Sequence, residues 1–314
     1  MQKKAVVLLN MGGPNNLDEV KVFLHNMFND KNIITVKSDF LRSFIAFMIV
    51  TSRSKAAKKN YSQIGGKSPI VGYTKALVAK LQKEFDDTFI TFAMRYTPPF
   101  GDEALAQIQE KGIKEVFLLP LYPHFSTTTT KSSLEDFRTL MRSKKMDLKL
   151  SSIKRFFGNE RYNELLIQRI LEALGDQDPK DFTLICSAHS LPQKIVDKGD
   201  PYQREILLHV EHIKAMLQAK KIVFQGVHVA YQSKLGPVKW LEPSLEEKLK
   251  SLTCKKVLIA PLSFTIDNSE TEFELDIEYR EVAHALGYEE YRVAKCPNDA
   301  DAFVAMLKEI IVHS

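Results

Sequence analysis

Short apolar runs, rich in β-branched residues, alternate with longer amphipathic segments along the chain. The short runs are typical of buried strands, and the longer segments repeat apolar residues at helical spacing. This alternation predicts parallel sheets that are covered by helices on both faces. We predict strands at residues 5–10, 89–96, 115–122, 149–156, 182–187, 222–231, 256–264 and 291–295. Helices are predicted at residues 16–28, 71–84, 102–111, 160–174, 201–219, 243–250, 269–286 and 298–312.

The predicted strands fall into two sets. Four strands precede residue 157 and four follow it, which predicts an α/β protein with two similar doubly wound domains. A chain of 314 residues is long enough for two domains that each bury a core. No low-complexity linker separates the sets, so the boundary rests on strand count. In such folds ligands bind beyond the carboxyl ends of the strands, and between the domains when there are two.

Two loops at predicted strand ends each allow two interpretations. NMGGP, residues 10–14, has two glycines that permit a tight turn or a close approach to a ligand. It lacks both the G-x-G-x-x-G pattern and a P-loop lysine, which disfavours dinucleotide and P-loop binding. The hydroxyl-rich YPHFSTTTTKSS, residues 122–133, either caps the helix that begins near Leu134 or binds an anionic group.

His189 follows the fifth predicted strand, within CSAHSLP at residues 186–192. An imidazole can accept a proton near neutral pH or bind a metal. A lone histidine is more often structural, but a place at the carboxyl end of a strand favours chemistry. The seventh predicted strand ends at Phe264 and leads into an acidic helix, so His189 and that helix can face the same cleft.

The acidic helix lies in FTIDNSETEFELDIEYRE, residues 264–281, which contains seven acidic residues and one basic residue, Arg280. Glu270, Glu274 and Glu278 follow one another at intervals of four, and like charges at this spacing repel each other on an α-helix. The row is either an exposed acidic face or a set of oxygen ligands that receives or passes a divalent cation.

Residues 35–61 contain an apolar helical stripe followed by a basic cluster. The stripe is either the buried face of a helix or an exposed lip that guides a flat apolar ligand or touches an anionic membrane surface. The stripe consists of Leu41, Phe44, Ile45, Phe47 and Met48, and the cluster of Arg53, Lys55, Lys58 and Lys59.

The composition, with 44% hydrophobic and 26% charged residues, is that of an ordinary soluble protein. A net charge of +5 is well short of a nucleic-acid-binding signature. Cys186, Cys254 and Cys296 are odd in number and far apart, which argues for a reducing compartment and against a disulfide framework or a Cys-rich metal site. The N-terminal apolar run is too short for a secretory signal, and no run approaches the roughly 20 residues that span a bilayer. We therefore expect a cytoplasmic protein.

Eight motifs, taken in order, resemble those of ferrochelatases over nearly the whole chain. The resemblance implies a chelatase fold of two Rossmann-like domains, each a four-stranded parallel sheet flanked by helices, with the C-terminal helix returning to the first domain. We assign residues 1–118 with 297–314 to an N-terminal domain that carries the lip, and 119–296 to a C-terminal domain that carries His189 and the acidic helix. The motifs are LLNMGGP (8–14), IGGKSPI (64–70), MRYTPPF (94–100), LPLYPHFSTTTTKSS (119–133), SAHSLP (187–192), GDPY (199–202), YQSKLGPVKWLEPS (231–244) and FTIDNSETEFELDIEY (264–279).

The resemblance also implies an activity: the insertion of Fe²⁺ into a porphyrin, which is the last step of haem synthesis. It makes His189 and Glu270 the catalytic pair and the metal contacts, with His189 as proton acceptor or metal ligand. Glu274 and Glu278 continue outward as a route for iron or protons, and Asp267 begins the same row.

One residue departs from the family pattern. Many relatives have a histidine directly after the aspartate that corresponds to Asp267, whereas this chain has Asn268. Because asparagine cannot relay charge at neutral pH, Asn268 is left out of the catalytic set.

The matching motifs also supply candidates for the porphyrin pocket. Met11 matches a residue that lies against the macrocycle in members that use protoporphyrin, whereas members that use coproporphyrin often have a tyrosine there. The resemblance thus favours protoporphyrin IX, and the alternatives are a coproporphyrin III ferrochelatase and a non-catalytic tetrapyrrole- or metal-binding protein. The other candidates for propionate or pocket contacts are Arg95, Tyr96, Ser126 and Thr127. Trp240 either packs against the macrocycle or has a structural role.

The resemblance further bears on cofactors and partners. Porphyrin and ferrous iron are expected as substrates, and no prosthetic group is expected. Some relatives carry a Cys-rich extension that binds a [2Fe–2S] cluster and often supports dimerisation; this chain has no such set of cysteines, so we expect no cluster and a monomer. Residues 41–59 are a candidate for peripheral contact with the inner face of the membrane, and no nucleic-acid partner is expected.

Overall fold

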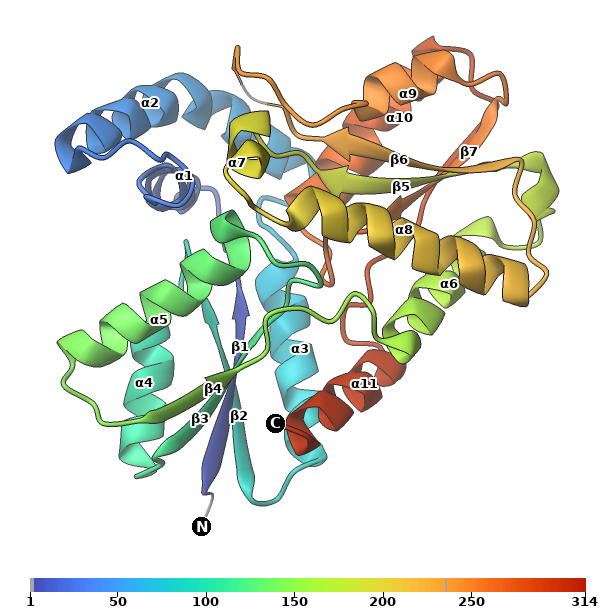
Figure 1. The fold of residues 1–314 in the computed structure, drawn as a ribbon. Coiled ribbons are helices and arrows are strands. Elements are labelled where there is room, and N and C mark those ends of the chain that lie inside the picture. Colours follow the sequence, from blue (N-terminus) through green and yellow to red (C-terminus); the bar gives the residue numbers. More distant parts are fainter. Residues whose placement is uncertain (1–2, 235) are drawn as a thin grey trace. The chain divides into compact units, whose positions relative to one another are not determined.

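The computed structural model describes residues 3–234 and 236–314. The chain forms two compact units (Figure 1). The first unit runs to residue 155 and also contains residues 299–314, and the second unit comprises residues 156–298. Within each unit strands alternate with helices, and the two four-stranded parallel sheets confirm the predicted α/β fold.

The first unit is built on a sheet with the strand order β2-β1-β3-β4. The inner strand β1 pairs with β2 on one side and with β3 on the other, so Lys4 lies opposite both Thr88 and Glu115. The strand is buried along nearly its whole length because helices cover both faces of the sheet. The strands are β1 (Lys4–Asn10), β2 (Thr88–Met94), β3 (Glu115–Pro120) and β4 (Lys149–Ser152).

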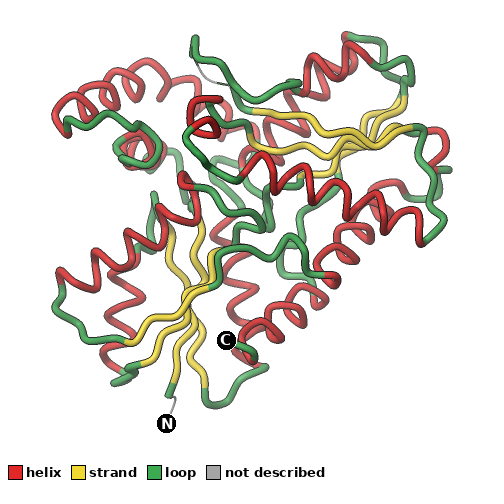
Figure 2. Tube along the Cα trace, viewed as in Figure 1, coloured by secondary structure: helices red, strands yellow, loops and turns green. Residues whose placement is uncertain are grey.

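Helices pack on both faces of this first sheet. Val7 and Leu9 belong to the core beneath α4 and α5, and α3 packs on the opposite face with α11 beside it (Figure 2). An ion pair of 2.9 Å between Lys80 and Asp301 joins α3 to α11, so the C-terminal helix belongs to the first unit. The helices are α1 (Val20–Phe28), α2 (Asp39–Gln63), α3 (Ile70–Lys83), α4 (Gly101–Glu110), α5 (Ser132–Ser143) and α11 (Asp301–Val312).

The second unit repeats this topology with the strand order β6-β5-β7-β8. At the carboxyl end of the inner strand β5, His189 lies opposite Gln232 of β6. Its strands are β5 (Thr183–His189), β6 (Gly226–Gln232), β7 (Lys256–Pro261) and β8 (Glu290–Val293). Its helices are α6 (Glu160–Leu174), α7 (Gln193–Asp197), α8 (Tyr202–Ala219), α9 (Leu245–Ser251), the π-helix Glu270–Glu278 and α10 (Tyr279–Ala285).

The two units divide at a different place from the domain boundary expected at residues 118 and 119. That boundary would cut β3, which pairs with β1 over Glu115–Pro120. The next strand, β4, pairs with β3 in turn, so the first unit extends to residue 155. The chain returns to it at residue 299, close to the expected residue 297.

The acidic segment is a helix, as predicted, but not an α-helix in its first part. Glu270–Glu278 is π-helical, and the backbone N–H of Tyr279 bonds to the carbonyl of Glu274, five residues back. A π-helical turn contains more residues than the 3.6 of an α-helix, so its hydrogen bonds reach back five residues and not four. Hydrophobic spacing could not reveal this difference, since both helix types place residues four apart on one face.

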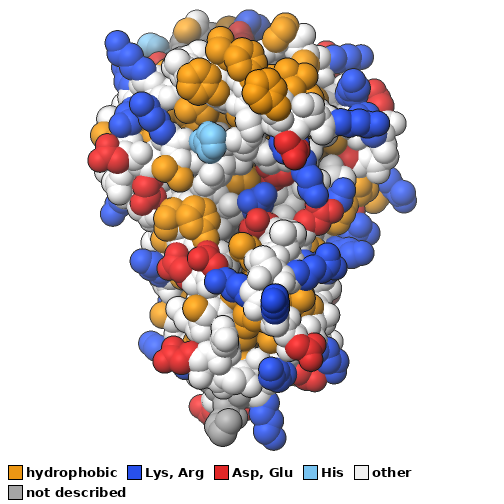
Figure 3. Space-filling model, turned by 90° about the vertical axis from the view of Figure 1, so that its left-hand side faces the viewer, with side chains coloured by type: hydrophobic (Ala, Val, Ile, Leu, Met, Phe, Trp, Pro, Cys, Tyr) orange, Lys and Arg blue, Asp and Glu red, His pale blue; other side chains and the backbone are white. Residues whose placement is uncertain are grey.

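The apolar stripe on α2 is exposed, which decides between the two interpretations that its sequence allowed. The helix begins after the N-cap Ser38, whose hydroxyl accepts a hydrogen bond from the backbone N–H of Leu41. Phe44 is 54% exposed and Phe47 is 60% exposed, and apolar side chains gather near the top of the face in Figure 3. Such a patch marks an interaction surface. None of the described helices combines the length and the apolarity needed to cross a bilayer.

Candidate functional site

His189 is the last residue of β5, which lies between β6 and β7 in the second sheet. The chain passes from β5 to its neighbour β6 and then crosses back to β7 on the other side of β5. Open parallel sheets bind ligands where the strand order reverses in this way, beyond the carboxyl ends of the strands. The fold of the second unit therefore places His189 where a substrate site is expected.

Two hydroxyl groups fix the backbone of His189. The hydroxyl oxygen of Ser263 accepts a hydrogen bond of 3.0 Å from the His189 N–H, and the hydroxyl of Tyr202 donates to the His189 carbonyl at 2.9 Å. Burial raises the pKa of Tyr202, so this hydroxyl keeps its proton and remains a donor. The backbone is held in this way while 38% of the histidine side chain stays exposed.

The carboxylate of Glu270 meets the imidazole directly. The distance between Nδ1 of His189 and Oε2 of Glu270 is 2.7 Å. The same oxygen accepts hydrogen bonds from Oγ of Ser233 at 3.0 Å and from Nε2 of Gln232 at 3.4 Å. Ser187 donates to Oε1 of Gln232 at 2.6 Å, which orients the amide toward Glu270. Several donors on one carboxylate oxygen favour its ionised form.

The pKa values of this pair move apart. Burial alone would lower the pKa of His189, but the charge and hydrogen bond of Glu270 outweigh burial and raise it. Burial alone would raise the pKa of Glu270, but His189 and then Ser233 bring it below its usual value. These shifts favour the charged pair, imidazolium and carboxylate, over the neutral pair, and the imidazole must lose its proton before it can accept another or bind a metal. Because Nδ1 is engaged by Glu270, Nε2 is the ring nitrogen that can face a substrate.

Glu274 belongs to the same cluster, one turn further along the π-helix. The backbone N–H of Ser233 donates to its Oε1 at 2.7 Å, and Oγ of Ser233 lies 2.5 Å from its Oε2. Burial, and then the nearby charge of Glu270, raise the pKa of Glu274 to about 7. Glu274 can therefore take up or release a proton near neutral pH, as catalytic acids and bases must.

The two other acidic residues of the predicted row lie in different surroundings. Glu278 ends the π-helix and is exposed. Asp267 is only 1% exposed, and its carboxylate accepts hydrogen bonds from Nδ2 of Asn298 at 2.7 Å and from the N–H of Cys296 at 3.2 Å. Asp267 therefore does not lie on the accessible row, where the sequence placed it. It ties the start of the acidic segment to the loop that follows β8.

Asn268 serves as a neutral cap at the start of the π-helix. Its Oδ1 accepts a hydrogen bond of 2.8 Å from the backbone N–H of Glu270, and its Nδ2 donates to the carbonyl of Ile266 at 3.1 Å. Asparagine is well suited to satisfy the free N–H groups at a helix start. The side chain holds the backbone of Glu270 in place and exchanges no proton.

Taken one by one, the side chains that could contact an entering metal ion are His189, through Nε2, Glu270 and Glu274. Nitrogen and oxygen donors of this kind suit ferrous iron. Within the described residues, no three or more His, Cys, Asp or Glu side chains are grouped so as to enclose a metal.

Met11 and Tyr96 lie together in the first unit, beyond the ends of β1 and β2. The N–H of Tyr96 bonds to the carbonyl of Met11 at 3.0 Å, and Met11 is half-buried. Gly12 has a φ of +82°, and a Cβ at this position would lie 2.4 Å from Oγ1 of Thr97. The glycine after Met11 is therefore required by the packing of the chain itself.

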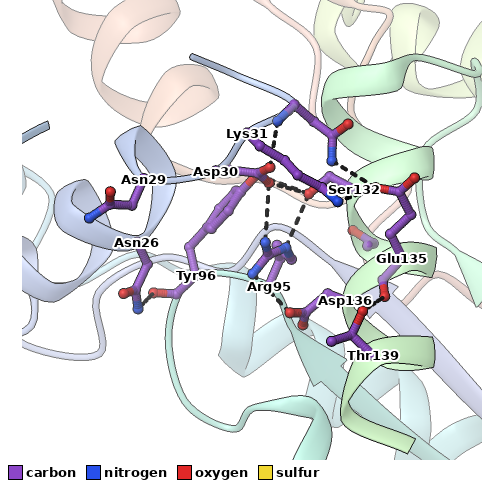
Figure 4. Close-up of polar contacts among 12 residues, drawn as sticks. Asn26, Asn29, Asp30, Lys31, Arg95, Tyr96, Ser132, Glu135, Asp136 and Thr139 are labelled. Carbon is purple, nitrogen blue, oxygen red and sulfur yellow. Dashed lines mark hydrogen bonds and ion pairs between the residues drawn. The ribbon is translucent and has the colours of Figure 1, made fainter. Parts of the chain in front are cut away.

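Arg95 and Tyr96 both point toward a buried carboxylate, that of Asp30 (Figure 4). Tyr96 donates to Oδ2 of Asp30 at 2.9 Å, Nη2 of Arg95 lies 3.3 Å from the same oxygen, and the hydroxyl of Ser132 also donates to it. Nη1 of Arg95 pairs with Asp136 at 3.2 Å. Because two carboxylates of the chain already balance the charge of Arg95, a porphyrin propionate would have to compete with them.

Ser126 and Thr127 lie at the start of the π-helical turn Thr127–Lys131, which leads into α5. Ser126 is 1% exposed, and its hydroxyl oxygen accepts a hydrogen bond of 3.1 Å from the N–H of Thr128. Thr127 is half-buried. The hydroxyl-rich loop thus caps a helix, which is one of the two roles that its sequence allowed.

Trp240 lies beside the loop that follows His189. Its segment runs antiparallel to residues 191–193, with the N–H of Gln193 bonded to the carbonyl of Lys239 at 2.8 Å. The indole is half-buried. The second unit therefore brings the single tryptophan of the chain close in space to the histidine loop.

Sequence reasoning missed several residues that organise these clusters. Ser233, Gln232 and Tyr202 lie in the motifs YQSKLGPVKWLEPS and GDPY, but their residue types alone did not single them out. Asp30 follows α1 without any pattern that links it to Arg95, which is 65 residues away. A signal of paired substitutions between such positions could have found these pairs; the spacing of apolar residues could not.

A family model described as Ferrochelatase matches residues 3–314. A protein of a Nitratiruptor species named ferrochelatase is 55% identical over 307 residues, which cover 98% of each chain. The ferrochelatase of Sulfurimonas denitrificans is 54% identical over 311 residues, covering 99% of this chain and 98% of that protein.

Solved structures show similarity at the level of the fold. SirB from Bacillus subtilis with Fe³⁺ has a TM-score of 0.57 at 12% identity, covering 98% of this chain and 95% of that one. CbiX, described as the terminal enzyme of sirohaem biosynthesis in denitrifying bacteria, has a TM-score of 0.55 at 11% identity, covering 99% of each chain. These two likenesses support the chelatase fold.

Proposed function

The chain belongs to the ferrochelatase family, and we propose that it inserts Fe²⁺ into protoporphyrin IX to give protohaem, the terminal step of haem synthesis. The observation that carries this proposal is the contact of 2.7 Å between His189 and Glu270 at the carboxyl end of β5. A group that exchanges protons near neutral pH lies there beside a carboxylate that can balance the charge of a cation.

The reaction exchanges two protons for one dication. Two pyrrole N–H protons leave the macrocycle, Fe²⁺ binds the four ring nitrogens, and the charge of the ring system is unchanged. We propose that His189 and Glu270 accept the leaving protons and contact the entering metal, with His189 acting through Nε2. A planar ring hides the nitrogen lone pairs, so the pocket must also hold the macrocycle distorted.

We propose that Glu274 and Glu278 form the route by which iron or protons reach or leave this pair. Glu274 shares Ser233 with Glu270, and Glu278 is exposed at the far end of the same π-helix. Asp267 is assigned a supporting part, because its buried carboxylate fixes the start of the acidic segment.

Protoporphyrin IX is proposed as the porphyrin because Met11 occupies the position where coproporphyrin-using relatives often have tyrosine. The coproporphyrin III reaction is the alternative within the family. A tetrapyrrole or metal carrier is the non-catalytic alternative, and it is disfavoured because transport requires no proton acceptor beside a carboxylate.

An anaerobic metallation assay tests the proposed function. Purified protein is mixed with Fe²⁺ and, separately, protoporphyrin IX or coproporphyrin III, and absorbance follows wild type, His189→Ala and Glu270→Ala. We expect wild type to metallate protoporphyrin and both variants to lose this activity while they still bind the porphyrin. Preference for coproporphyrin would overturn the assignment that rests on Met11. Porphyrin binding without metallation by wild type would leave a carrier.

We also propose that α2 touches an anionic membrane surface, where an apolar substrate and product can be exchanged. Its support is the exposed stripe with Phe44 and Phe47, followed on the same helix by basic residues such as Lys55. Co-sedimentation with vesicles that contain phosphatidylglycerol tests this contact. We expect binding that weakens with salt and is lost in Phe44→Ser/Phe47→Ser, and no binding to phosphatidylglycerol vesicles would refute it.

The remaining proposals concern assembly and cofactors. We propose a cytoplasmic monomer that needs no prosthetic group. Light scattering and metal analysis of the purified protein test both points, since a dimer mass or bound iron–sulfur absorbance would contradict them.

A further inference from the structure

Ser233 adopts a backbone conformation that is unusual for its residue type. It directly follows β6 and has a φ of +66°, in the left-handed region. Residues other than glycine, asparagine and aspartate seldom adopt this conformation, and the strain costs on the order of 1 kcal/mol or more. A strained residue persists where its surroundings hold it, so the contacts of Ser233 show what offsets the strain.

Within the described part of the chain, the side-chain and backbone N–H contacts of Ser233 lead to the acidic residues of the site. Its N–H donates to Oε1 of Glu274 at 2.7 Å, while its Oγ lies 2.5 Å from Oε2 of Glu274 and 3.0 Å from Oε2 of Glu270. One residue thus contacts both oxygens of Glu274 and one oxygen of Glu270, and its single hydroxyl proton is shared between the two carboxyl groups. The left-handed backbone turns the N–H and the hydroxyl toward the π-helix together.

This clamp opposes the repulsion between two neighbouring carboxylates. Glutamate side chains four apart on an exposed helix would rotate away from each other into solvent, because like charges at this spacing destabilise the helix. The shared hydroxyl instead brings an oxygen of Glu270 and an oxygen of Glu274 to the same atom. Hard cations are bound by several oxygens at once, so a held pair binds iron better than two separate side chains.

We propose that Ser233 is a positioning residue for the metal substrate: it holds Glu270 and Glu274 as a pair, so that entering Fe²⁺ meets both carboxylates beside His189. The inference rests on the proposed function and adds to it the residue that assembles the metal-receiving group. It assigns Ser233 to the metal side of the reaction and not to the binding of the porphyrin.

Two variants of the full chain test the proposal. Ser233→Gly removes the hydroxyl, keeps the N–H and favours the left-handed backbone, so it folds even if the strained Ser233→Ala does not. Ser251→Ala is the matched control, because Ser251 also bonds through its hydroxyl, to the carbonyl of Lys248, at the exposed end of α9. Steady-state metallation is measured with Fe²⁺ varied at fixed protoporphyrin IX and then with protoporphyrin IX varied at fixed Fe²⁺.

We expect Ser233→Gly to raise the KM for Fe²⁺ about 10-fold, as the loss of a hydrogen bond to a charged group predicts. The KM for protoporphyrin IX stays at the wild-type value, and Ser251→Ala behaves as wild type in both titrations. Titration of the porphyrin-free protein with Zn²⁺ shows the same loss of affinity.

Two results would overturn the inference while leaving the proposed function intact. In one, wild type metallates protoporphyrin and Ser233→Gly keeps the wild-type KM for Fe²⁺. In the other, Ser233→Gly raises the KM for porphyrin alone, which would make Ser233 a porphyrin contact. If wild type itself fails to metallate any porphyrin, the proposed function fails first.

Discussion

Each unit holds a buried acidic cluster near the carboxyl end of a strand, and the two clusters differ in the cation that balances them. In the first unit Asp30 is paired with Arg95 at 3.3 Å, and in the second unit Glu270 is paired with His189 at 2.7 Å. A guanidinium stays protonated at every physiological pH, whereas an imidazole gains and loses its proton near neutrality.

This difference separates a structural cluster from a reactive one. The three nitrogens of Arg95 contact Ser132, Asp136 and Asp30, so the first cluster fixes the loops around it and has no proton to exchange. His189 uses one nitrogen to contact Glu270 and keeps the other available. Both clusters look alike as partly buried ion pairs, and the chemistry of the cation indicates which one can take part in metallation.

The largest effect is expected when the titratable cation of the second cluster is replaced by a permanently charged one, as in the first cluster. His189→Arg replaces the exchangeable cation with a fixed one, so turnover should fall about 10²- to 10⁴-fold, the usual contribution of a positioned acid or base. Metallation rate and porphyrin binding are measured together. His189→Gln, which keeps a donor but no exchangeable proton, should lose turnover to a similar extent. Wild-type turnover in His189→Arg would show that no proton passes through residue 189.

The reverse substitution, Arg95→His, should make the stability contributed by the first cluster depend on pH. In Arg95→His the new imidazole is protonated beside Asp30 and Asp136, so its pKa in the folded state is raised above the unfolded value near 6.5. Its stabilising contribution is present below pH 6.5 and is lost as the pH rises through the folded-state pKa. At high pH the buried Asp30 is left without its cation, and the loss should reach about 3 kcal/mol.

Urea unfolding from pH 5 to pH 9 checks this expectation. Arg95→Lys is the control, because lysine keeps its charge over the range and should show no added pH dependence. An Arg95→His variant whose stability relative to wild type is constant from pH 5 to pH 9 would contradict the account of the first cluster.

A third change tests the coupling inside the second cluster. In wild type the pKa of His189 is raised by Glu270, so the limb of the rate profile that needs neutral imidazole should lie above pH 6.5. Glu270→Gln removes the charge and the hydrogen bond that raise this pKa and leaves burial, which lowers it, against the charge of Glu274, so the limb should move to lower pH as the maximal rate falls. Profiles of kcat/KM against pH measure the shift. Glu278→Gln, at the exposed end of the same π-helix, should leave the limb in place. If the limb stays at the same pH in Glu270→Gln, His189 is not the group whose titration the profile reports.

The hydrophobic pattern predicted the sheets well because it records burial. Residues 5–10 and 256–264 were predicted as strands, and β1 (Lys4–Asn10) and β7 (Lys256–Pro261) begin within one residue of them, because a parallel strand covered on both faces must be apolar throughout; β7 ends three residues earlier than predicted. The same pattern could not distinguish an α-helix from the π-helix that Glu270–Glu278 forms. It also left the position of the α2 stripe open, because an apolar helix face looks the same in a core and on a surface.

The site was predictable only in part for a related reason. His189 and Glu270 were expected to face one site because both follow strand ends, and the second unit brings them into contact. Ser233 could not be predicted, because its role depends on a left-handed backbone that serine rarely adopts. Arg95 was expected at a propionate, and only the fold revealed that Asp30 and Asp136 lie beside it.

The smallest expected effect concerns the proton on Glu274. Its pKa in the folded state is about 7, above the ordinary value of 4.5, so between these values the folded protein holds a proton that the unfolded chain has lost. Stability must therefore fall as the pH rises through this window.

Glu274→Gln removes the titration and still accepts the N–H of Ser233, so the Tm of the variant minus that of wild type should be near zero at pH 4 and become positive toward pH 8. Glu278→Gln should show no such trend. Calorimetry at several pH values decides, and a difference that does not vary with pH would mean that folding leaves the pKa of Glu274 at its ordinary value. The second cluster would then have only one exchangeable proton, on His189, and would differ from the first by that single group.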